Sequence, residues 1–176
     1  LASLATFLEE ELGANPRQEA IDILNMMKSR TGRLQGLIDG ILHYSRMGNV
    51  TESKETFSTK ELVISIIDLL SPPSNVRFEV ADSLPEVTAE KIKLHEVFQN
   101  LISNSIKYNN KDNSVIKIEF QEFPTYFEFS VIDNGIGIKE EHQSKIFGIF
   151  QTLVPKDKVE STGIGLTIVK KIVEQQ

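Results

Sequence analysis

The stretch Asp133-Asn134-Gly135-Ile136-Gly137-Ile138 decides the fold of this chain, read together with Thr162-Gly163-Ile164-Gly165-Leu166. An Asp-Asn-Gly sequence on its own is a common turn. Here, however, an Asn-containing helix precedes it, an apolar strand runs into Asp133, and a polar loop separates the two glycine-rich stretches. Chance rarely supplies these parts in this order, so we expect them to build one site.

Composition excludes several classes of function. The 176 residues carry a formal net charge of −6, whereas nucleic acids and anionic membranes select a basic surface. We therefore expect no nucleic-acid partner. The chain contains no cysteine, which excludes disulfides, thiolate metal sites and thiol catalysis. No apolar run is long enough to cross a membrane, so we expect no membrane contact.

Residues 1–48 are predicted to form a helical hairpin. Leu1–Leu12 has apolar residues at helical spacing, residues 13–16 contain Gly and Pro that break the helix, and a longer helix spans Gln18–Met47. Two antiparallel helices cannot bury a heptad pattern alone, so we expect homodimerisation into a four-helix bundle. The heptad positions of the longer helix are Ala20, Leu24, Met27, Thr31, Leu34, Ile38, Ile41 and Ser45.

A second unit is predicted after the hairpin. Residues 49–58 are polar and are predicted to be a linker, and residues 59–176 are predicted to be a separate domain. The fold class is therefore α+β, with a helical hairpin followed by an α/β sandwich. Helices of the domain are predicted at Thr59–Leu70, Lys91–Tyr108 and Gly163–Glu174, and strands at Val76–Val80, Pro85–Val87, Val115–Phe120 and Tyr126–Ile132.

The helix Lys91–Tyr108 carries an unusual polar face. A solvated surface is one explanation of it. Asn, however, is about 0.5 kcal/mol worse than Ala in a helix, and a merely solvated face more often uses Glu, Lys or Gln. The side-chain oxygen of Asn suits a Mg²⁺ ion that is also coordinated by phosphates, and a lysine one turn further could contact phosphate oxygens. The face is formed by Lys93, Glu96, Asn100, Asn104 and Lys107.

Asp133 ends an apolar strand, where its carboxylate could accept a hydrogen bond from the exocyclic amine of adenine. The alternative is an Asx-type turn in which Gly135 supplies a positive φ. Gly137 would permit close approach of the backbone to a base or ribose. Gly163 and Gly165 open a helix, whose free N–H groups favour an anion. The glycines form neither a P-loop nor a dinucleotide fingerprint, because no Gly-Lys-Ser/Thr and no third glycine follow at the required spacing.

Taken together, these residues resemble the catalytic core of a two-component sensor histidine kinase, whose ATP-binding domain shares the fold of gyrase-type ATPases. Glu96–Tyr108 is similar to the N box, Asp133–Ile138 to the G1 box, Ile146–Phe150 to the F box and Thr162–Leu166 to the second glycine box. The resemblance implies Asn104 as the Mg²⁺ ligand. It also implies an ATP site formed by Asn100, Asn104, Lys107, Tyr108, Asp133, Gly135, Gly137, Ile138, Phe147, Thr162, Gly163, Ile164, Gly165 and Leu166.

The resemblance implies an ATP-dependent protein-histidine kinase located in the cytoplasm. In the family, an acceptor histidine on the first hairpin helix takes the γ-phosphoryl group and passes it to an aspartate of a response-regulator receiver domain. That histidine would fall upstream of Leu1, so we expect a truncated first helix and no catalytic side chain within this chain. The family's sheet also continues with strands that would follow Gln176, and we expect these to be missing.

The three histidines in the chain are poor substitutes for that acceptor. His43 lies late in the second hairpin helix, His95 lies on the Asn-containing helix, and His142 precedes the polar loop. Scattered in this way, they predict no zinc site. Related hydrolytic ATPases have a water-activating glutamate at the position of Asn100, so its absence here favours transfer to a protein side chain.

Two other functions remain open at this point. One is an anti-sigma-type serine kinase, which shares the nucleotide-binding fold but lacks a heptad hairpin. The other is a non-catalytic module that binds nucleotide or only dimerises. The presence of Asn104, Asp133 and the paired glycines argues against the second alternative.

Overall fold

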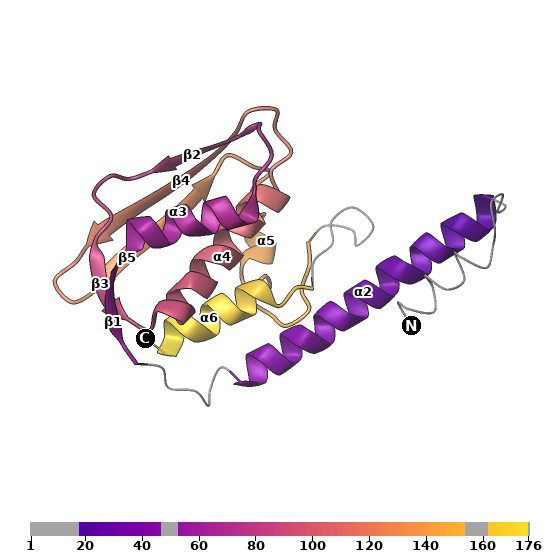
Figure 1. Ribbon diagram of the computed structural model, residues 1–176, viewed down its shortest axis with the longest axis horizontal. Coiled ribbons are helices and arrows are strands. Elements are labelled where there is room, and N and C mark those ends of the chain that lie inside the picture. The colour runs from indigo at the N-terminus through magenta and orange to yellow at the C-terminus, as the bar shows by residue number, and fades with distance from the viewer. Residues whose placement is uncertain (1–17, 47–52, 154–161, 176) are drawn as a thin grey trace.

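The computed structural model describes residues 18–46, 53–153 and 162–175. The predicted helix Leu1–Leu12, its break at residues 13–16, the beginning of the linker and most of the loop before residue 162 lie outside these ranges. Within them, one long helix, α2 (Gln18–Arg46), lies against an α/β unit with its C-terminal part and projects away from that unit toward Gln18 (Figure 1). None of the helices in these ranges is long and apolar enough to cross a membrane.

The α/β unit is built on a three-stranded sheet with the order β2-β4-β5. β4 (Ser114–Glu122) lies in the centre, parallel to β2 (Val76–Val80) and antiparallel to β5 (Phe127–Asp133). A separate antiparallel pair is formed by β1 (Glu55–Ser58) and β3 (Glu86–Ala89). Asp133 pairs with Ile116 near the beginning of β4. The end of β5 that carries Asp133 therefore lies beside the loop that follows α4.

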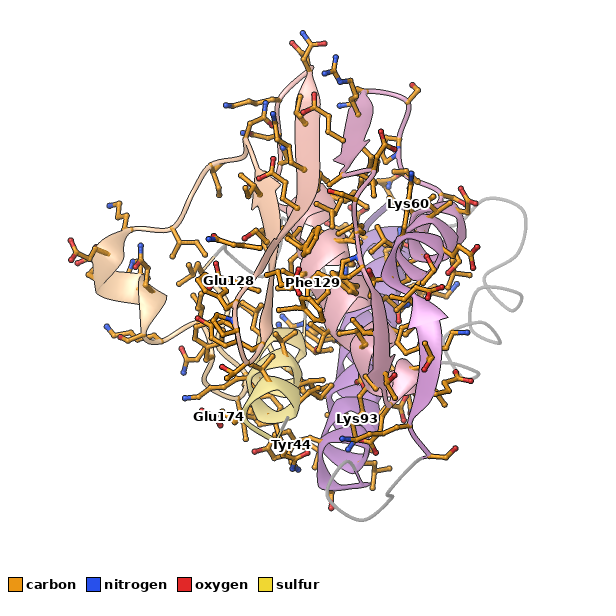
Figure 2. All side chains as sticks on the ribbon, turned by 90° about the vertical axis from the view of Figure 1, so that its left-hand side faces the viewer. Tyr44, Lys60, Lys93, Glu128, Phe129 and Glu174 are labelled. Atoms are coloured by element: carbon orange, nitrogen blue, oxygen red, sulfur yellow. The ribbon has the colours of Figure 1, made fainter. Side chains whose placement is uncertain are left out.

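Helices α3 (Thr59–Leu70) and α4 (Lys91–Lys107) cover one face of the sheet, and α6 (Gly165–Gln175) packs against α4 (Figure 1). The core between the sheet and these helices includes Phe98, whose ring meets that of Phe129 edge to face with centroids 5.5 Å apart. Glu128, the preceding residue on β5, is exposed, as alternation along a strand requires (both are labelled in Figure 2). The fully buried aliphatic residues of this core are Val63, Ile66, Ile102, Ile116 and Ile118.

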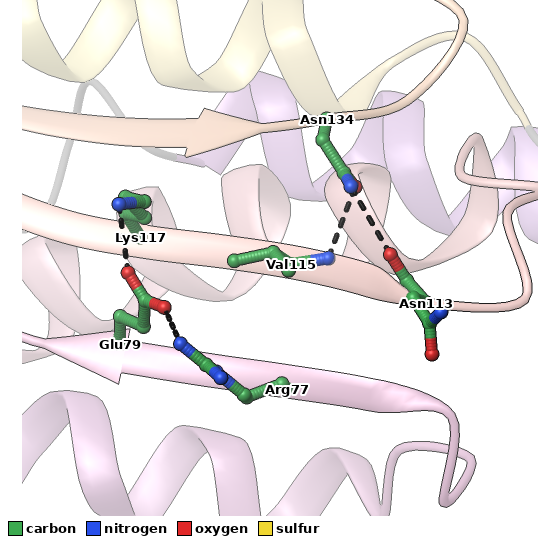
Figure 3. A network of polar contacts seen from close by, with 6 residues as sticks. All are labelled: Arg77, Glu79, Asn113, Val115, Lys117 and Asn134. Carbon is green, nitrogen blue, oxygen red and sulfur yellow. Dashed lines mark hydrogen bonds and ion pairs between the residues drawn. The ribbon is translucent and has the colours of Figure 1, made fainter.

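The opposite face of the sheet is polar. Glu79 of β2 forms an ion pair with Lys117 of β4 at 2.8 Å and a second one with Arg77 (Figure 3). Hydrogen bonds from Lys117 and then Arg77 hold the pKa of the Glu79 carboxyl below its usual range. This face therefore contains a charged network instead of a second apolar core.

The C-terminal half of α2 packs against α6. Leu37 and Tyr44 border a second apolar cluster, whose buried residues include Ile164, and Tyr44 lies beside α6 (Figure 2). Nζ of Lys171 donates to the carbonyl oxygen of Tyr44 at 2.7 Å and lies 4.1 Å from the centroid of the Tyr44 ring. Gly40 makes the approach possible, because a Cβ atom there would lie 2.4 Å from Cδ1 of Ile164.

The structure confirms the predicted fold class and places the helices and strands of residues 59–175 close to their expected bounds. The predicted linker is wrong at its end, because Glu55–Ser58 form β1 and pair with β3. Only Phe57 of this short strand is buried, so its sequence has too little alternation to predict a strand. The four-residue helix α5 (Glu140–Gln143) was not predicted either.

Candidate functional site

One wall of a surface pocket is formed by the polar face of α4. The side chains come from successive turns of the helix, because residues three and four apart share a helix face. Tyr108 caps the helix, and its N–H donates to the carbonyl oxygen of Asn104 at 2.9 Å. The α4 residues of the pocket are Asn100, Ser103, Asn104, Lys107 and Tyr108.

The facing wall is formed by the segment that enters α6. Thr162, Gly163, Gly165 and Leu166 line it, with Ile146 and Gln151 from the segment that follows α5. The carbonyl oxygen of Gly163 accepts a hydrogen bond from the N–H of Phe150 at 3.0 Å, which ties these two segments together. The first turn of a helix has N–H groups without partners inside the helix, so this wall favours an anion.

Gly165 and Asn100 explain how closely the two walls approach. A Cβ atom on Gly165 would lie 2.4 Å from Oδ1 of Asn100. The Asn100 side chain is oriented by a hydrogen bond in which its Nδ2 donates to the carbonyl oxygen of Glu96 at 2.9 Å. A side chain at position 165 would therefore have to displace the Asn100 amide from this position.

Asp133 lies at the end of β5, and both of its carboxylate oxygens are hydrogen-bonded. Oδ1 accepts from the N–H of Gly135 at 2.8 Å, and Oδ2 accepts from the buried hydroxyl of Ser105 on α4 at 3.2 Å. The Asx-type turn is therefore present. The positive φ expected at Gly135 is wrong, because it occurs at Gly137, where φ is 70°. Gly135 is needed for space instead, since its Cβ would lie 3.1 Å from the carbonyl oxygen of Tyr108.

Most of the residues predicted for the nucleotide site line this one pocket: Asn100, Asn104, Lys107, Tyr108, Thr162, Gly163, Gly165 and Leu166. Asp133 and Gly135 do not line it but contact α4 beside it, through Ser105 and Tyr108.

The remaining predicted residues lie elsewhere. Ile138 and Phe147 are exposed, and a Cβ atom on Gly137 would meet only open space. Ile164 is buried in the apolar cluster between α4, α6 and α2, because its side chain faces away from the pocket wall.

Several residues of the site were not predicted. Ser103 and Ser105 were not assigned a role, although both lie on the Asn-containing helix. The helical period places Ser105 on the apolar face, so only its polar character could have signalled a contact with another element. Ile146 and Gln151 reach the pocket through the path of an irregular segment, which no periodicity predicts.

Asn104 is the residue of this pocket that is predicted from the sequence to hold a metal ion. Within the described ranges no three His, Cys, Asp or Glu side chains gather into a possible metal site. Asn104 is half-buried in the pocket wall, and no described residue hydrogen-bonds to its side-chain amide. A single neutral oxygen suits Mg²⁺, which keeps several water ligands and takes others from phosphates.

Comparison with known proteins agrees with this geometry. Residues 89–176 match the family described as histidine kinase-, DNA gyrase B-, and HSP90-like ATPase. The chain is 40% identical to cyanobacterial phytochrome B of Nostoc sp. (strain PCC 7120), over 97% of this chain and 23% of that protein. It is 29% identical to the methanogenesis regulatory histidine kinase FilI of Methanothrix harundinacea, over 96% of this chain and 19% of that protein. The chain thus spans about a fifth of the length of these relatives.

Solved structures share the fold. Full-length ShkA in complex with AMPPNP superposes with a TM-score of 0.67 at 20% identity, over 98% of this chain and 40% of that chain. The histidine kinase ThkA in complex with the response regulator TrrA gives a TM-score of 0.62 at 24% identity, over 86% of this chain and 46% of that chain. The fold of this chain, a long helix followed by an α/β ATPase-type domain, therefore matches solved histidine kinase structures, as the sequence predicted.

Proposed function

Because this chain belongs to the family of histidine kinase-, DNA gyrase B- and HSP90-like ATPases and forms the catalytic core of a sensor histidine kinase, we propose that it binds Mg·ATP between α4 and α6 and phosphorylates a histidine. The acceptor would lie upstream of Leu1, and the phosphoryl group would pass to an aspartate of a response-regulator receiver domain. In this proposal the protein acts in a two-component system in the cytoplasm.

One observation supports the nucleotide site above all others. The Asn-containing face of α4 and the glycine-rich entry to α6 are far apart in the chain, with Asn104 and Gly163 59 positions apart, yet they line the same pocket. Asp133 lies beside this pocket, held by α4 through Ser105. In the proposed complex, Asp133 accepts from the adenine amine, Lys107 meets phosphate oxygens, and the first turn of α6 receives the anionic end of the nucleotide.

Mg²⁺ fits the residues at the phosphate end of the proposed site, where Asn104 would hold it. When bound, the ion would neutralise negative charge on the phosphate oxygens. The chain's own contribution is positioning. Gly165 lets α4 and α6 approach each other, and Asn100 offers an amide where a hydrolytic enzyme needs a carboxylate base. Water is therefore not activated at this position, which favours a protein side chain as the acceptor.

Phosphorylation of the parent protein tests this function. A longer chain that includes the natural residues before Leu1 is expected to take up label from γ-labelled ATP as acid-labile, base-stable phosphohistidine. Asn104→Ala should lower the rate by at least about tenfold, since even outer-shell partners of a metal contribute that much. Label on His43 or His95, or full activity of the Asn104 variant, would contradict the proposal.

The proposed dimer uses the exposed side of α2. Leu34, Ile38 and Ile41 are 45–52% exposed in the single chain, whereas Leu37 and Tyr44 face α6. The α/β unit and a second copy of the hairpin can therefore contact α2 on different sides. Burial of this apolar strip would contribute about 25 cal/mol per Å² to association.

Ile38→Glu tests that dimer, because it introduces an unpaired carboxylate into the contact. We expect monomers in sedimentation equilibrium, because a buried unpaired charge costs several kcal/mol. Ser29→Glu is the matched control, since Ser29 is exposed and lies on the opposite side of α2. A dimer that survives Ile38→Glu, or one that is lost equally in the control, would place the contact elsewhere.

A further inference from the structure

The turn that follows β5 is tied to a neighbouring segment by the side chain of Asn134 (Figure 3). Its Oδ1 accepts from the N–H of Val115 at 3.0 Å and from Nδ2 of Asn109 at 2.8 Å. Its Nδ2 donates to the carbonyl oxygen of Asn113 at 3.1 Å. The backbone N–H of Asn134 also donates to the carbonyl oxygen of Val115 at 3.2 Å. The half-buried amide thus uses three of its four hydrogen-bonding positions within the protein.

These contacts connect the two parts of the proposed nucleotide site. Asn134 directly follows Asp133, the proposed adenine partner. Asn109 directly follows Tyr108, which caps α4 and lines the pocket together with Lys107. Asn109 itself is held in place, because its Oδ1 accepts from the N–H of Lys111 at 3.2 Å. The hydrogen bond of 2.8 Å between the two Asn side chains therefore links two ends of the proposed site. The base end is the end with Asp133, and the phosphate end is the end with Lys107.

We infer that Asn134 is a positioning residue, which sets the distance between the Asp133 carboxylate and the C-terminal end of α4. This inference rests on the proposed function, because it assumes that a purine nucleotide spans both ends. We assign Asn134 no direct contact with the nucleotide, since its three side-chain partners are protein groups: Asn109 in the loop after α4, Asn113 just before β4, and Val115 in β4. A ligand that engages both ends depends on this distance, whereas a ligand that engages only one end does not.

A positioning role and a purely structural role of Asn134 predict different effects on the affinities for ATP, adenosine and inorganic pyrophosphate. If Asn134 only stabilised the sheet, its loss would leave the three affinities unchanged or lower them equally. If it sets the distance, ATP should lose affinity while adenosine and inorganic pyrophosphate with Mg²⁺, which each use one end, should keep theirs. For Asn134→Ala in the full 176-residue chain, we expect ATP to bind about tenfold more weakly, and adenosine and pyrophosphate to change by less than about twofold.

The control is Glu79→Gln, which disrupts an equally polar network on the same sheet, between β2 and β4 and away from the turn (Figure 3). It should lower the melting temperature without changing the affinity for any of the three ligands. A second variant, Asn109→Ala, removes the bridge together with the hydrogen bond from the N–H of Lys111, and it leaves the contacts of Asn134 to Val115 and Asn113 in place. It should show the same selective loss for ATP, and Asn134→Ala combined with Asn109→Ala should lose no more than Asn134→Ala alone.

Titration calorimetry and ligand-observed NMR on the folded variants measure these affinities. Equal losses for all three ligands, or no loss for ATP, would overturn the inference. Should Asn134→Ala fail to fold, Asn109→Ala decides the question by the same comparison. Failure of the proposed function has a different signature, because the unmodified chain would then bind no Mg·ATP at all.

Discussion

Gly163→Ala is expected to weaken Mg·ATP binding by about tenfold or more while lowering the melting temperature by only a few degrees. Gly163 has a φ of 69°, a conformation that costs a residue with a side chain about 1–2 kcal/mol. In addition, its Cβ would lie 2.7 Å from the carbonyl oxygen of Gln151 and 2.7 Å from the carbonyl carbon of Phe150. Both neighbours are backbone atoms, so the pocket wall itself must move.

Gly137→Ala is the matched control for this prediction. Gly137 has nearly the same conformation, with a φ of 70°, but a Cβ atom there would contact nothing within 4 Å. It therefore bears the conformational cost without the steric one. Calorimetric titration of both variants with Mg·ATP measures the difference. Equal affinities would show that the close packing at Gly163 has no role in the site.

Asp133→Asn is expected to lower ATP affinity by about tenfold or more and to erode discrimination against GTP, because losing a charge-assisted hydrogen bond costs about 1.5–3 kcal/mol. The structure explains why the amide cannot substitute. The N–H of Gly135 requires an acceptor at Oδ1, so the amide nitrogen must take the position of Oδ2, where the hydroxyl of Ser105 can rotate to accept. A donor then stands where adenine requires an acceptor.

Ser105→Ala separates charge from orientation in this experiment. The variant keeps the carboxylate but removes one of its two described hydrogen-bond donors, so ATP affinity should fall by only about threefold. Titrations of both variants with ATP and GTP give the affinity and the selectivity. If Asp133→Asn left both unchanged, Asp133 would lie outside the nucleotide site, although the pocket between α4 and α6 would remain.

Local patterns in the sequence were sufficient for most elements of the fold. The 3.6-residue period predicts α3 and α4, and alternation predicts β4 and β5, because each pattern reflects burial of a single face. The site was predictable for a different reason. Asn100 and Asn104 contradict helix propensity on an otherwise regular helix, and such a contradiction indicates a role beyond local structure.

By itself, then, the sequence determined which faces are apolar, where most helices and strands lie, and which residues have the chemistry for a nucleotide. Tertiary structure alone decided which of them meet. The parallel pairing of β2 with β4, the contact of Gly165 with Asn100 and the bridge from Asn134 to Asn109 join residues that are between 25 and 65 positions apart. Tertiary structure also decided that Gly135 is needed for space and Gly137 for its positive φ. Propensity and periodicity describe a residue's own neighbourhood, whereas these contacts depend on how whole elements pack.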